Sequence, residues 1–301
     1  MGTIRLLWRD ADRLPYLYTL RQAAAAYGTE LVLEKAMSRE YGELLMAGVV
    51  DMLGENYWNQ QLSKAKGAPL VSVAAAVNTI NEQVFVRPGI TSLGELAGKR
   101  IALRDMRPTN LIDPLWIERR GLGSAELVFV PEAESGRWSP WKRVVEGDCD
   151  AAIVTNLFAA PAVAAGLHSL PMGRFGFLGN VVLTTTRENL SRMRADVENL
   201  VRGMFDAARA FKSDAAKILG IMQTIPQELM QPPNITIGTS EERGRVYGHL
   251  RDELSETPIP TTEAISNFYE MALPHYPELA GYNPLQMWDL SIAARIIDER
   301  N

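Results

Sequence analysis

Cysteine and histidine are scarce in this chain, which has one cysteine, Cys149, and three histidines among 301 residues. A single cysteine cannot form an internal disulfide or a thiolate metal site, and the histidines lack the spacing of metal ligands. The sequence therefore excludes disulfide scaffolds and cysteine-based zinc or iron–sulfur centres. We expect neither a metal nor a cofactor.

A net positive charge and long apolar runs are lacking as well. With 31 basic and 36 acidic residues the formal net charge is −5, which gives no positive field to attract a nucleic acid. The longest near-apolar run, residues 151–167, is too short to span a bilayer comfortably and contains polar residues, so no membrane span is expected. The N-terminus shows no basic leader followed by an apolar stretch. As written, the chain is expected to be cytoplasmic; it would be periplasmic or lipid-anchored outside if a signal peptide was removed.

Several catalytic motifs are missing too. The sequence contains no G-x-x-x-x-G-K-[ST], no G-x-G-x-x-G after a strand and no H-E-x-x-H. Nucleotide hydrolysis, hydride transfer and zincin chemistry therefore have no support. His168, His249 and His275 each stand apart from any nucleophile motif, so a catalytic triad is not visible.

What the sequence does contain is an alternation of short apolar runs with longer helical patterns, up to about residue 185. This alternation is typical of βαβ units on a parallel sheet and predicts an α/β fold. The pattern predicts strands at residues 4–8, 30–34, 50–53, 69–77, 83–86, 99–104, 126–130, 151–154 and 181–186. From residue 187 to about residue 300 the pattern is helical.

The length suggests two lobes, at about 150 residues per domain. A connection rich in Pro, Gly and Ser, residues 87–94, predicts that the chain crosses between lobes there. We therefore expect lobe 1 to comprise residues 1–87 and 182–301, and lobe 2 to comprise residues 88–181. No linker separates the helical C-terminal region, so we expect it to pack on lobe 1.

A short pattern occurs once in each predicted lobe. Gly48 stands three residues before Asp51, and Gly147 three residues before Asp150, each pair between a helix end and a buried strand. Glycine takes the left-handed conformation that ends a helix, and an aspartate in the turn can cap free backbone amides. The pattern predicts two lobes of related construction.

The segment Ser92-Leu-Gly-Glu-Leu-Ala-Gly98-Lys-Arg-Ile-Ala-Leu103 resembles the lobe-crossing signature of type II periplasmic binding proteins. Together with the two glycine-capped turns and Lys66-Gly-Ala-Pro-Leu70, it resembles more narrowly the nitrate/sulfonate/taurine binding proteins and the NMT1/THI5-like group. The resemblance covers residue 3 to about residue 215. It implies two α/β lobes that close on a small, often anionic or heteroaromatic ligand. It does not imply one activity, because the same fold serves ABC-import receptors and cytosolic enzymes, among them decarboxylases, a desulfinase and a chorismate dehydratase.

Two enzymes of this fold differ from the sequence at their key residues. The pyrimidine precursor synthase of thiamin biosynthesis would require a cysteine-rich motif and a histidine in the site, whereas the one cysteine here lies in a structural turn. The desulfinase uses a nucleophilic cysteine near the N-terminus, where this sequence has Asp10 and no cysteine. Neither chemistry is supported.

Polar residues after the predicted strands are candidate ligand-binding residues, because open α/β sheets bind ligands at the carboxyl ends of their strands. In lobe 1 these candidates are Trp8, Arg9, Asp10, Ser38, Arg39, Glu55, Asn56, Tyr57 and Asn78. The aromatic residues would stack on a ring at the rim of the lobe, and Asn78 would donate hydrogen bonds. The alternatives are packing for the aromatic residues, a turn for Asn78 and a local ion pair for Arg9 and Asp10.

In lobe 2 the candidates are Arg104, Arg107, Thr109, Asn110, Thr155 and Asn156. Thr109 or Asn110 would cap a helix whose free N–H groups bind a carboxylate, sulfonate or phosphate. Arg104 or Arg107 would clamp a planar anion, the alternative being a surface arginine. Thr155 and Asn156 occupy the place in lobe 2 that Glu55 and Asn56 occupy in lobe 1.

Two functions are consistent with these residues. The leading hypothesis is a solute-binding protein of the ABC-import type that closes two lobes on a small organic anion or heteroaromatic ligand, with a permease as partner if the chain is exported. The alternative is a cytosolic lyase, decarboxylase or hydrolase on the same fold. Its acid–base work would fall to Asp10 or Glu55, and Arg9 or Arg104 would hold a substrate carboxylate.

Overall fold

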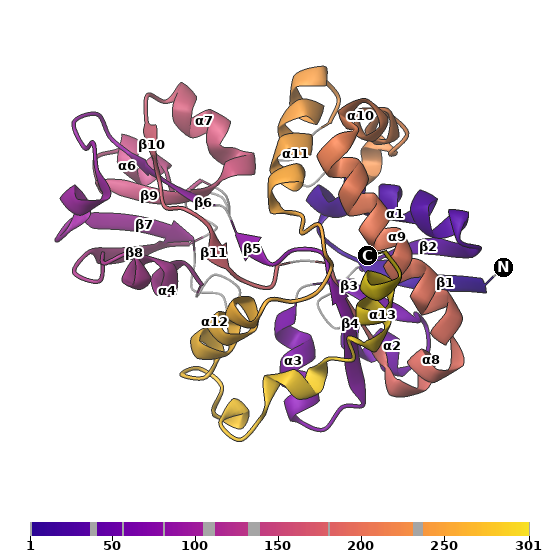
Figure 1. Ribbon diagram of the computed structural model, residues 1–301. Coiled ribbons are helices and arrows are strands. Elements are labelled where there is room, and N and C mark those ends of the chain that lie inside the picture. Colours follow the sequence, from indigo (N-terminus) through magenta and orange to yellow (C-terminus); the bar gives the residue numbers. More distant parts are fainter. Residues whose placement is uncertain are drawn as a thin grey trace. The chain divides into compact units, whose positions relative to one another are not determined.

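The computed structural model describes residues 2–36, 41–55, 57–80, 82–104, 112–131, 139–179, 181–230 and 237–300. The chain divides into two compact units, whose elements are labelled in Figure 1. Unit 1 comprises Met1–Thr79, Gly176–Tyr269 and Tyr276–Asn301, and unit 2 comprises Ile80–Phe175 and Glu270–His275. No helix in the described ranges is both long and apolar enough to cross a membrane.

Unit 1 is built, within the described residues, on a five-stranded sheet with the order β2-β1-β3-β12-β4. Its strands are β1 (Gly2–Trp8), β2 (Thr29–Lys35), β3 (Met52–Glu55), β4 (Leu70–Ala75) and β12 (Val182–Thr186). β1 pairs in parallel with β2 and β3, whereas β12 runs antiparallel to β3 and β4. Every residue of β4 and β12 is buried, so both faces of these strands are covered by other parts of the protein.

Helices from both halves of the sequence surround this sheet, directly or through other helices. They are η1 (Ala11–Arg13), α1 (Leu14–Ala26), α2 (Tyr41–Met46), α3 (Tyr57–Ala65), α8 (Arg187–Arg192), α9 (Arg194–Ser213), α10 (Ala215–Gln223), η5 (Gln227–Met230), α11 (Ser240–Glu253), η6 (Pro277–Leu279), η7 (Pro284–Met287) and α13 (Ser291–Arg300). The helix α12 (Thr262–Ala272) begins in unit 1. α9 buries one apolar face against α1 and also contacts α10, α11 and α13. The helical C-terminal region thus packs largely on the first unit.

Unit 2 contains a second five-stranded sheet in its described residues, with the order β10-β6-β9-β7-β8. Its strands are β6 (Glu82–Val86), β7 (Arg100–Arg104), β8 (Glu126–Val130), β9 (Ala151–Thr155) and β10 (His168–Pro171). Its helices are η2 (Leu93–Leu96), α4 (Ile112–Arg119), α6 (Lys142–Val145), η4 (Asn156–Phe158) and α7 (Ala159–Ala164). β7 is parallel to β8 and β9, and β6 is antiparallel to β9 and β10. Two short strands, β5 (Thr79–Ile80) and β11 (Phe175–Gly176), pair where the chain changes unit.

The two sheets follow one plan. Read from β8, the second sheet has the order β8-β7-β9-β6-β10, in which each strand has the direction of its counterpart in β2-β1-β3-β12-β4. The repeated glycine–aspartate turn is part of this plan. Gly48 and Gly147 have φ of 71° and 83°, the left-handed conformation that glycine adopts readily.

The two aspartates of this turn make equivalent hydrogen bonds. Asp51 Oδ2 accepts from the backbone N–H of Arg5 at 3.0 Å, and Asp150 Oδ2 accepts from that of Arg100 at 3.1 Å. In return, the backbone N–H groups of Asp51 and Asp150 donate to the carbonyls of these two arginines at 3.0 and 2.9 Å. The prediction that each aspartate caps backbone amides is confirmed, because each one joins its turn to the neighbouring strand.

The sheets are mixed, so the predicted parallel arrangement holds for three strands of each sheet and not for the other two. β6 and β12 each enter a sheet directly from a connecting segment and not through a crossover helix, and such a strand can run antiparallel to its neighbours. The predicted crossing after residue 87 also assigned the strand at residues 83–86 to lobe 1. This strand pairs with β9 and β10 and therefore belongs to unit 2.

Candidate functional site

Charged side chains gather directly after β1, at the carboxyl end of that strand. Arg9 donates two hydrogen bonds to Asp10, from Nε to Oδ1 at 2.9 Å and from Nη2 to Oδ2 at 3.0 Å. Arg13, the last residue of η1, donates from Nη1 to Glu253 Oε2 at 2.8 Å, and its Nε lies 3.1 Å from Asp12 Oδ2. The sequence Arg9–Arg13 therefore supplies two arginines and two aspartates to one location.

The helix α11 adds two buried side chains to this group. His249 and Glu253 lie one helical turn apart, with His249 Nε2 at 3.4 Å from Glu253 Oε2. Burial alone would raise the pKa of Glu253, but the adjacent His249 and Arg13 outweigh it and hold the pKa below its ordinary value. Burial raises the pKa of Asp12, although Arg13 opposes this. We call Arg9, Asp10, Asp12, Arg13, His249 and Glu253 the β1-end cluster.

Replacing Glu253 by glutamine should lower the free energy of unfolding by about 1–3 kcal/mol near neutral pH, because Arg13 and His249 lose a buried anionic partner. Since the folded-state pKa of Glu253 is lowered, its contribution is present above the unfolded-state pKa and is lost as the pH falls through the folded-state pKa. Urea unfolding of the wild type and Glu253→Gln at pH 7 and pH 3.5 measures the loss of unfolding free energy at each pH. The exposed Glu256→Gln variant is the control, with a change of at most about 0.5 kcal/mol. An equal loss for Glu253→Gln at both pH values would contradict an ionised Glu253.

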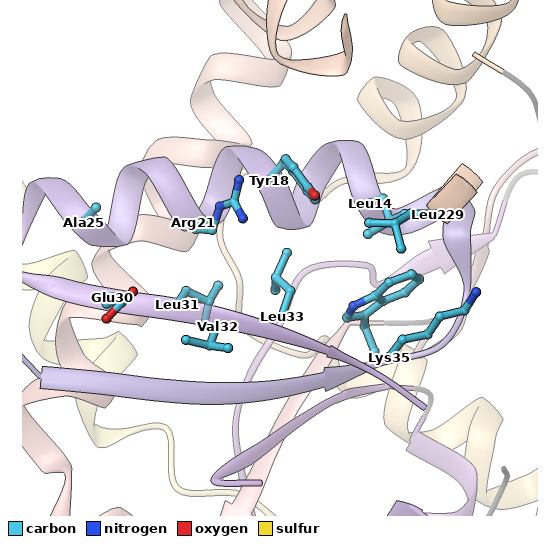
Figure 2. A pocket seen from close by; sticks show the side chains of 11 residues that line it. Leu14, Tyr18, Arg21, Ala25, Glu30, Leu31, Val32, Leu33, Lys35 and Leu229 are labelled. Atoms are coloured by element: carbon cyan, nitrogen blue, oxygen red, sulfur yellow. The ribbon is translucent and has the colours of Figure 1, made fainter. Parts of the chain in front are cut away.

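Trp8 also lines a groove of about 480 Å³ between α1 and β2 (Figure 2). The indole is almost fully buried, and Lys35 Nζ lies 5.8 Å from the centroid of the Trp8 ring. Leu14 and Tyr18 of α1 and Leu31 and Leu33 of β2 are among the side chains that line this groove. Trp8 therefore connects the strand end to an apolar groove.

A second buried polar cluster lies in unit 2 and joins β6, β7, β9 and α4. Arg104 Nη2 donates to Glu82 Oε1 at 2.8 Å and lies 3.2 Å from each oxygen of Asp113. Thr155 Oγ1, at the end of β9, also donates to Glu82 Oε1, at 3.1 Å. The side chains of Arg104, Glu82 and Asp113 are only 11%, 7% and 0% exposed. We call these four residues the β6–β7 cluster.

The β6–β7 cluster places two carboxylates beside one guanidinium away from water. Burial raises the pKa of Glu82 to about 8, an effect that Asp113 increases and Arg104 opposes. Burial alone would lower the pKa of Arg104, but Asp113 and Glu82 outweigh it and raise the pKa. The direction of this shift favours the protonated form of Glu82. In that form its carboxyl group can share a hydrogen bond with Asp113.

Comparison with known proteins identifies the family. The family model described as NMT1/THI5 like matches residues 30–214, which is more than half of the chain. The chain belongs to the NMT1/THI5-like family. No curated protein sequence matches it.

Solved structures similar to this NMT1/THI5-like chain extend over nearly its whole length. The protein assigned as the periplasmic sulfonate-binding protein SsuA of Methylobacillus flagellatus KT has a TM-score of 0.70 at 15% identity, over 99% of this chain and 94% of that chain. The aliphatic sulphonate binding protein SsuA from Escherichia coli has a TM-score of 0.65 at 14% identity, over 95% and 96%. The desulfurization enzyme DSZB has a TM-score of 0.62 at 14% identity, over 100% of both chains. The predicted type II periplasmic-binding-protein-like fold is confirmed.

The structure brings some predicted site residues of this family member together. Arg9 and Asp10 form a local ion pair in the β1-end cluster, which was the stated alternative to ligand binding. Arg104 and Thr155 both donate hydrogen bonds to Glu82. Arg104 is not a surface arginine. Its guanidinium binds carboxylates of the protein itself, so Arg104 does not present the predicted anion clamp in this structure.

Tyr57 and Asn78 take part in the core of unit 1. The ring of Tyr57 is fully buried and stacks on Trp288 at 5.3 Å between centroids, and its hydroxyl accepts from Trp288 Nε1 at 3.1 Å. Asn78 donates from Nδ2 to the carbonyl of Ile259 at 2.6 Å and accepts from the N–H of Thr261 at 3.2 Å. The predicted rim position of Tyr57 is wrong, because aromatic residues near the C-terminus cover it. The side-chain amide of Asn78 therefore forms hydrogen bonds through both its nitrogen and its oxygen to the backbone of residues 259–261.

The candidates outside the described residues are Ser38, Arg39, Asn56, Arg107, Thr109 and Asn110. For two more candidates only the backbone is described. Glu55 is the last residue of β3, and Asn156 is the first residue of η4.

Six residues of the two clusters were not predicted from the sequence: Asp12, Arg13, Glu82, Asp113, His249 and Glu253. Two signals were available: Glu82 begins an otherwise apolar strand, and His249 and Glu253 stand four residues apart on one helix face. Neither signal shows which arginine pairs with each of these carboxyl groups. Within the described ranges, no three His, Cys, Asp or Glu side chains form a group that could hold a metal ion.

Proposed function

We propose that this protein is the solute-binding component of an ABC-type importer, with a small organic molecule as its ligand. Membership of the NMT1/THI5-like family and whole-chain similarity to proteins named as sulfonate-binding support this role. The observation that carries the proposal is that two units of one sheet plan each place a buried polar cluster at the ends of their strands. An exported location and a permease partner belong to the same proposal.

The charges of the described clusters favour a heteroaromatic ligand with amino groups over a simple anion. Asp10, Asp12 and Glu253 face Arg9 and Arg13 in the β1-end cluster, and two carboxyl groups face Arg104 in the other. A sulfonate would have to displace these carboxylates from their arginines. An amino group of a ring can instead donate to them.

The enzyme alternative has less support. Both oxygens of Asp10 accept from Arg9, so this carboxylate is held by its neighbour. The similarity to DSZB shows a common fold at 14% identity and does not extend to the chemistry.

Isothermal titration at pH 7 with 4-aminopyrimidine, methanesulfonate and acetate tests the proposal. We expect saturable binding of the aminopyrimidine, weakened about tenfold in Asp10→Asn because a charged hydrogen bond is lost. The Arg143→Gln variant, altered at a surface pair with Asp148, should bind normally. Binding of methanesulfonate alone would overturn the ligand class. Absence of binding by all three would overturn the function.

The predicted closure of two lobes on the ligand stays a prediction. It requires that the ligand bind the closed form more tightly than the open form. Small-angle X-ray scattering should show a smaller radius of gyration with saturating ligand than without it. An unchanged radius would contradict closure.

A further inference from the structure

A groove of about 630 Å³ lies between α2 and α3, on one face of the sheet of unit 1. Its described lining residues all belong to unit 1, and none of them belongs to either charged cluster. A volume of this size is typical of a small-molecule site. Two helices form the walls, and the residues that α2 and α3 contribute are Gly42, Glu43, Met46, Ala47, Asn59 and Ser63.

The walls of this groove are open to solvent. Glu43 and Asn59 are exposed, and 52% of the surface of Met46 is accessible. Small residues keep the two walls apart. A methyl group at Gly42 would meet no atom of the described residues within 4 Å, its own helix backbone and chain neighbours apart. The packing of α2 beside α3 therefore leaves room for a ligand.

The sheet forms the floor of the groove. Leu53 of β3 and Leu70 of β4 line it, and β12 lies between these two strands. Thr184 of β12 pairs with Leu53 and with Ser72, so its side chain is on the same face of the sheet as those of Leu53 and Leu70. Thr184 Oγ1 donates to Gln60 Oε1 at 2.5 Å. The side-chain amide of Gln60 therefore lies over the middle of the floor.

The amide nitrogen of Gln60 is a hydrogen-bond donor that the protein leaves unused. Gln60 lines the groove and is only 2% exposed, and its Nε2 has no hydrogen-bond partner in the described part of the chain. The hydroxyl of Thr184 is already shared between Gln60 Oε1 and Ser72 Oγ, the latter at 2.7 Å. A buried donor without a partner destabilises the folded protein, and an acceptor removes that cost. The floor thus favours a ligand with a hydrogen-bond acceptor.

The other lining residues indicate an uncharged, aromatic ligand. Glu43 is the one charged residue among the described lining residues, and its carboxylate disfavours an anion. The buried leucines of the floor disfavour any ion, because its water shell would be lost there. The thioether of Met46 makes favourable contacts with aromatic rings.

We propose that this groove binds an uncharged aromatic carbonyl compound. The ring lies between α2 and α3 over Leu53 and Leu70, where burial of its apolar surface drives binding. The carbonyl oxygen accepts a hydrogen bond from Gln60 Nε2 at the floor. The inference does not depend on the proposed solute, since no residue of the two charged clusters takes part in it.

Three probes of similar shape test the site by equilibrium dialysis at pH 7. They are 2-acetylnaphthalene, which has a carbonyl oxygen, 2-isopropenylnaphthalene, which has a methylene group in its place, and the anion 2-naphthoate. We expect one equivalent of 2-acetylnaphthalene to bind, and the isopropenyl compound to bind about tenfold more weakly because one hydrogen bond is lost. The naphthoate should bind more weakly than 2-acetylnaphthalene. Absence of 2-acetylnaphthalene binding, or equal affinity for any two of the probes that differ in this way from it, would overturn the site.

The variant Gln60→Met removes the donor and keeps a long, unbranched side chain. It should weaken the binding of 2-acetylnaphthalene about tenfold and should not weaken that of 2-isopropenylnaphthalene. Gln61→Met is the matched control, because Gln61 is the next residue of α3, is 1% exposed and is not among the described residues that line the groove. An equal loss of 2-acetylnaphthalene affinity in the two variants would show that Gln60 does not bind the carbonyl oxygen.

The variant Gly42→Leu fills the groove from its wall and leaves the floor intact. Leucine favours a helix more than glycine does, and a side chain has space at this position, so the unfolding midpoint should not fall. Both uncharged naphthalenes should bind about tenfold more weakly or worse. Gly220→Leu, at an exposed glycine of α10 that also has free space, is the control and should bind normally. Unchanged binding in Gly42→Leu would place the ligand elsewhere and overturn the site.

Discussion

Replacing Arg104 by methionine should lower the free energy of unfolding by about 3–5 kcal/mol at pH 7. Methionine fills similar space, so the loss comes from charge and not from a cavity. Arg104 Nη2 serves Glu82 and both oxygens of the fully buried Asp113, and its removal leaves Asp113 without a cation in the interior. Urea unfolding of the variant and the wild type measures the difference.

Arg143→Met is the matched control for this change. Arg143 also belongs to unit 2 and pairs with Asp148 at 2.9 Å, but both side chains of that pair reach solvent. Its replacement should cost at most about 1 kcal/mol, because exposed ion pairs contribute little. A loss in Arg104→Met no larger than in the control would show that the β6–β7 cluster does not depend on its cation.

Replacing Glu82 by glutamine should remove a pH dependence that the wild type shows between about pH 4.5 and pH 8. The pKa of Glu82 is raised in the folded state to about 8 from its ordinary value of 4.5. Between these values the folded protein holds a proton that the unfolded chain has lost, so the wild type loses stability as the pH rises, by about 1.4 kcal/mol per unit at most. Glutamine resembles the protonated acid and has no such cost.

The two unfolding free energies should therefore diverge with pH. At pH 5 they should be close, and at pH 9 Glu82→Gln should be more stable than the wild type by about 3–5 kcal/mol. Urea unfolding at pH 5, 7 and 9 checks this, and Glu95→Gln, at an exposed carboxylate on η2, is the control. Parallel pH profiles for wild type and Glu82→Gln would show that Glu82 is ionised in the folded protein at neutral pH.

The periodicity of the sequence predicted much of the fold. The strands at residues 4–8, 30–34 and 126–130 lie within one or two residues of their observed bounds. Local pattern suffices for these strands because their apolar residues lie within a few positions of one another in the sequence. Strand direction is not encoded locally, and the antiparallel direction of the predicted strands β6 and β12 was missed.

The site was predicted less completely. Polar residues after a strand are visible in the sequence, and Arg9, Asp10, Arg104 and Thr155 do lie in the two clusters. Their partners lie far away in sequence, since Arg13 meets Glu253 across 240 positions. Tyr57 follows the same pattern as these residues and is nevertheless buried against Trp288. A polar or aromatic residue after a strand does not by itself show what will cover it.

By itself the sequence determined the α/β class, the glycine–aspartate turn of each half and the family resemblance, because these depend on short-range spacing and backbone conformation. Tertiary structure alone decided which charges meet. Glu82, Arg104, Asp113 and Thr155 come from four elements, and only sheet order and register place them within hydrogen-bonding distance. When these side chains are buried together, the loss of water and the neighbouring charges set their ionisation. The spacing of the residues along the chain does not reveal this.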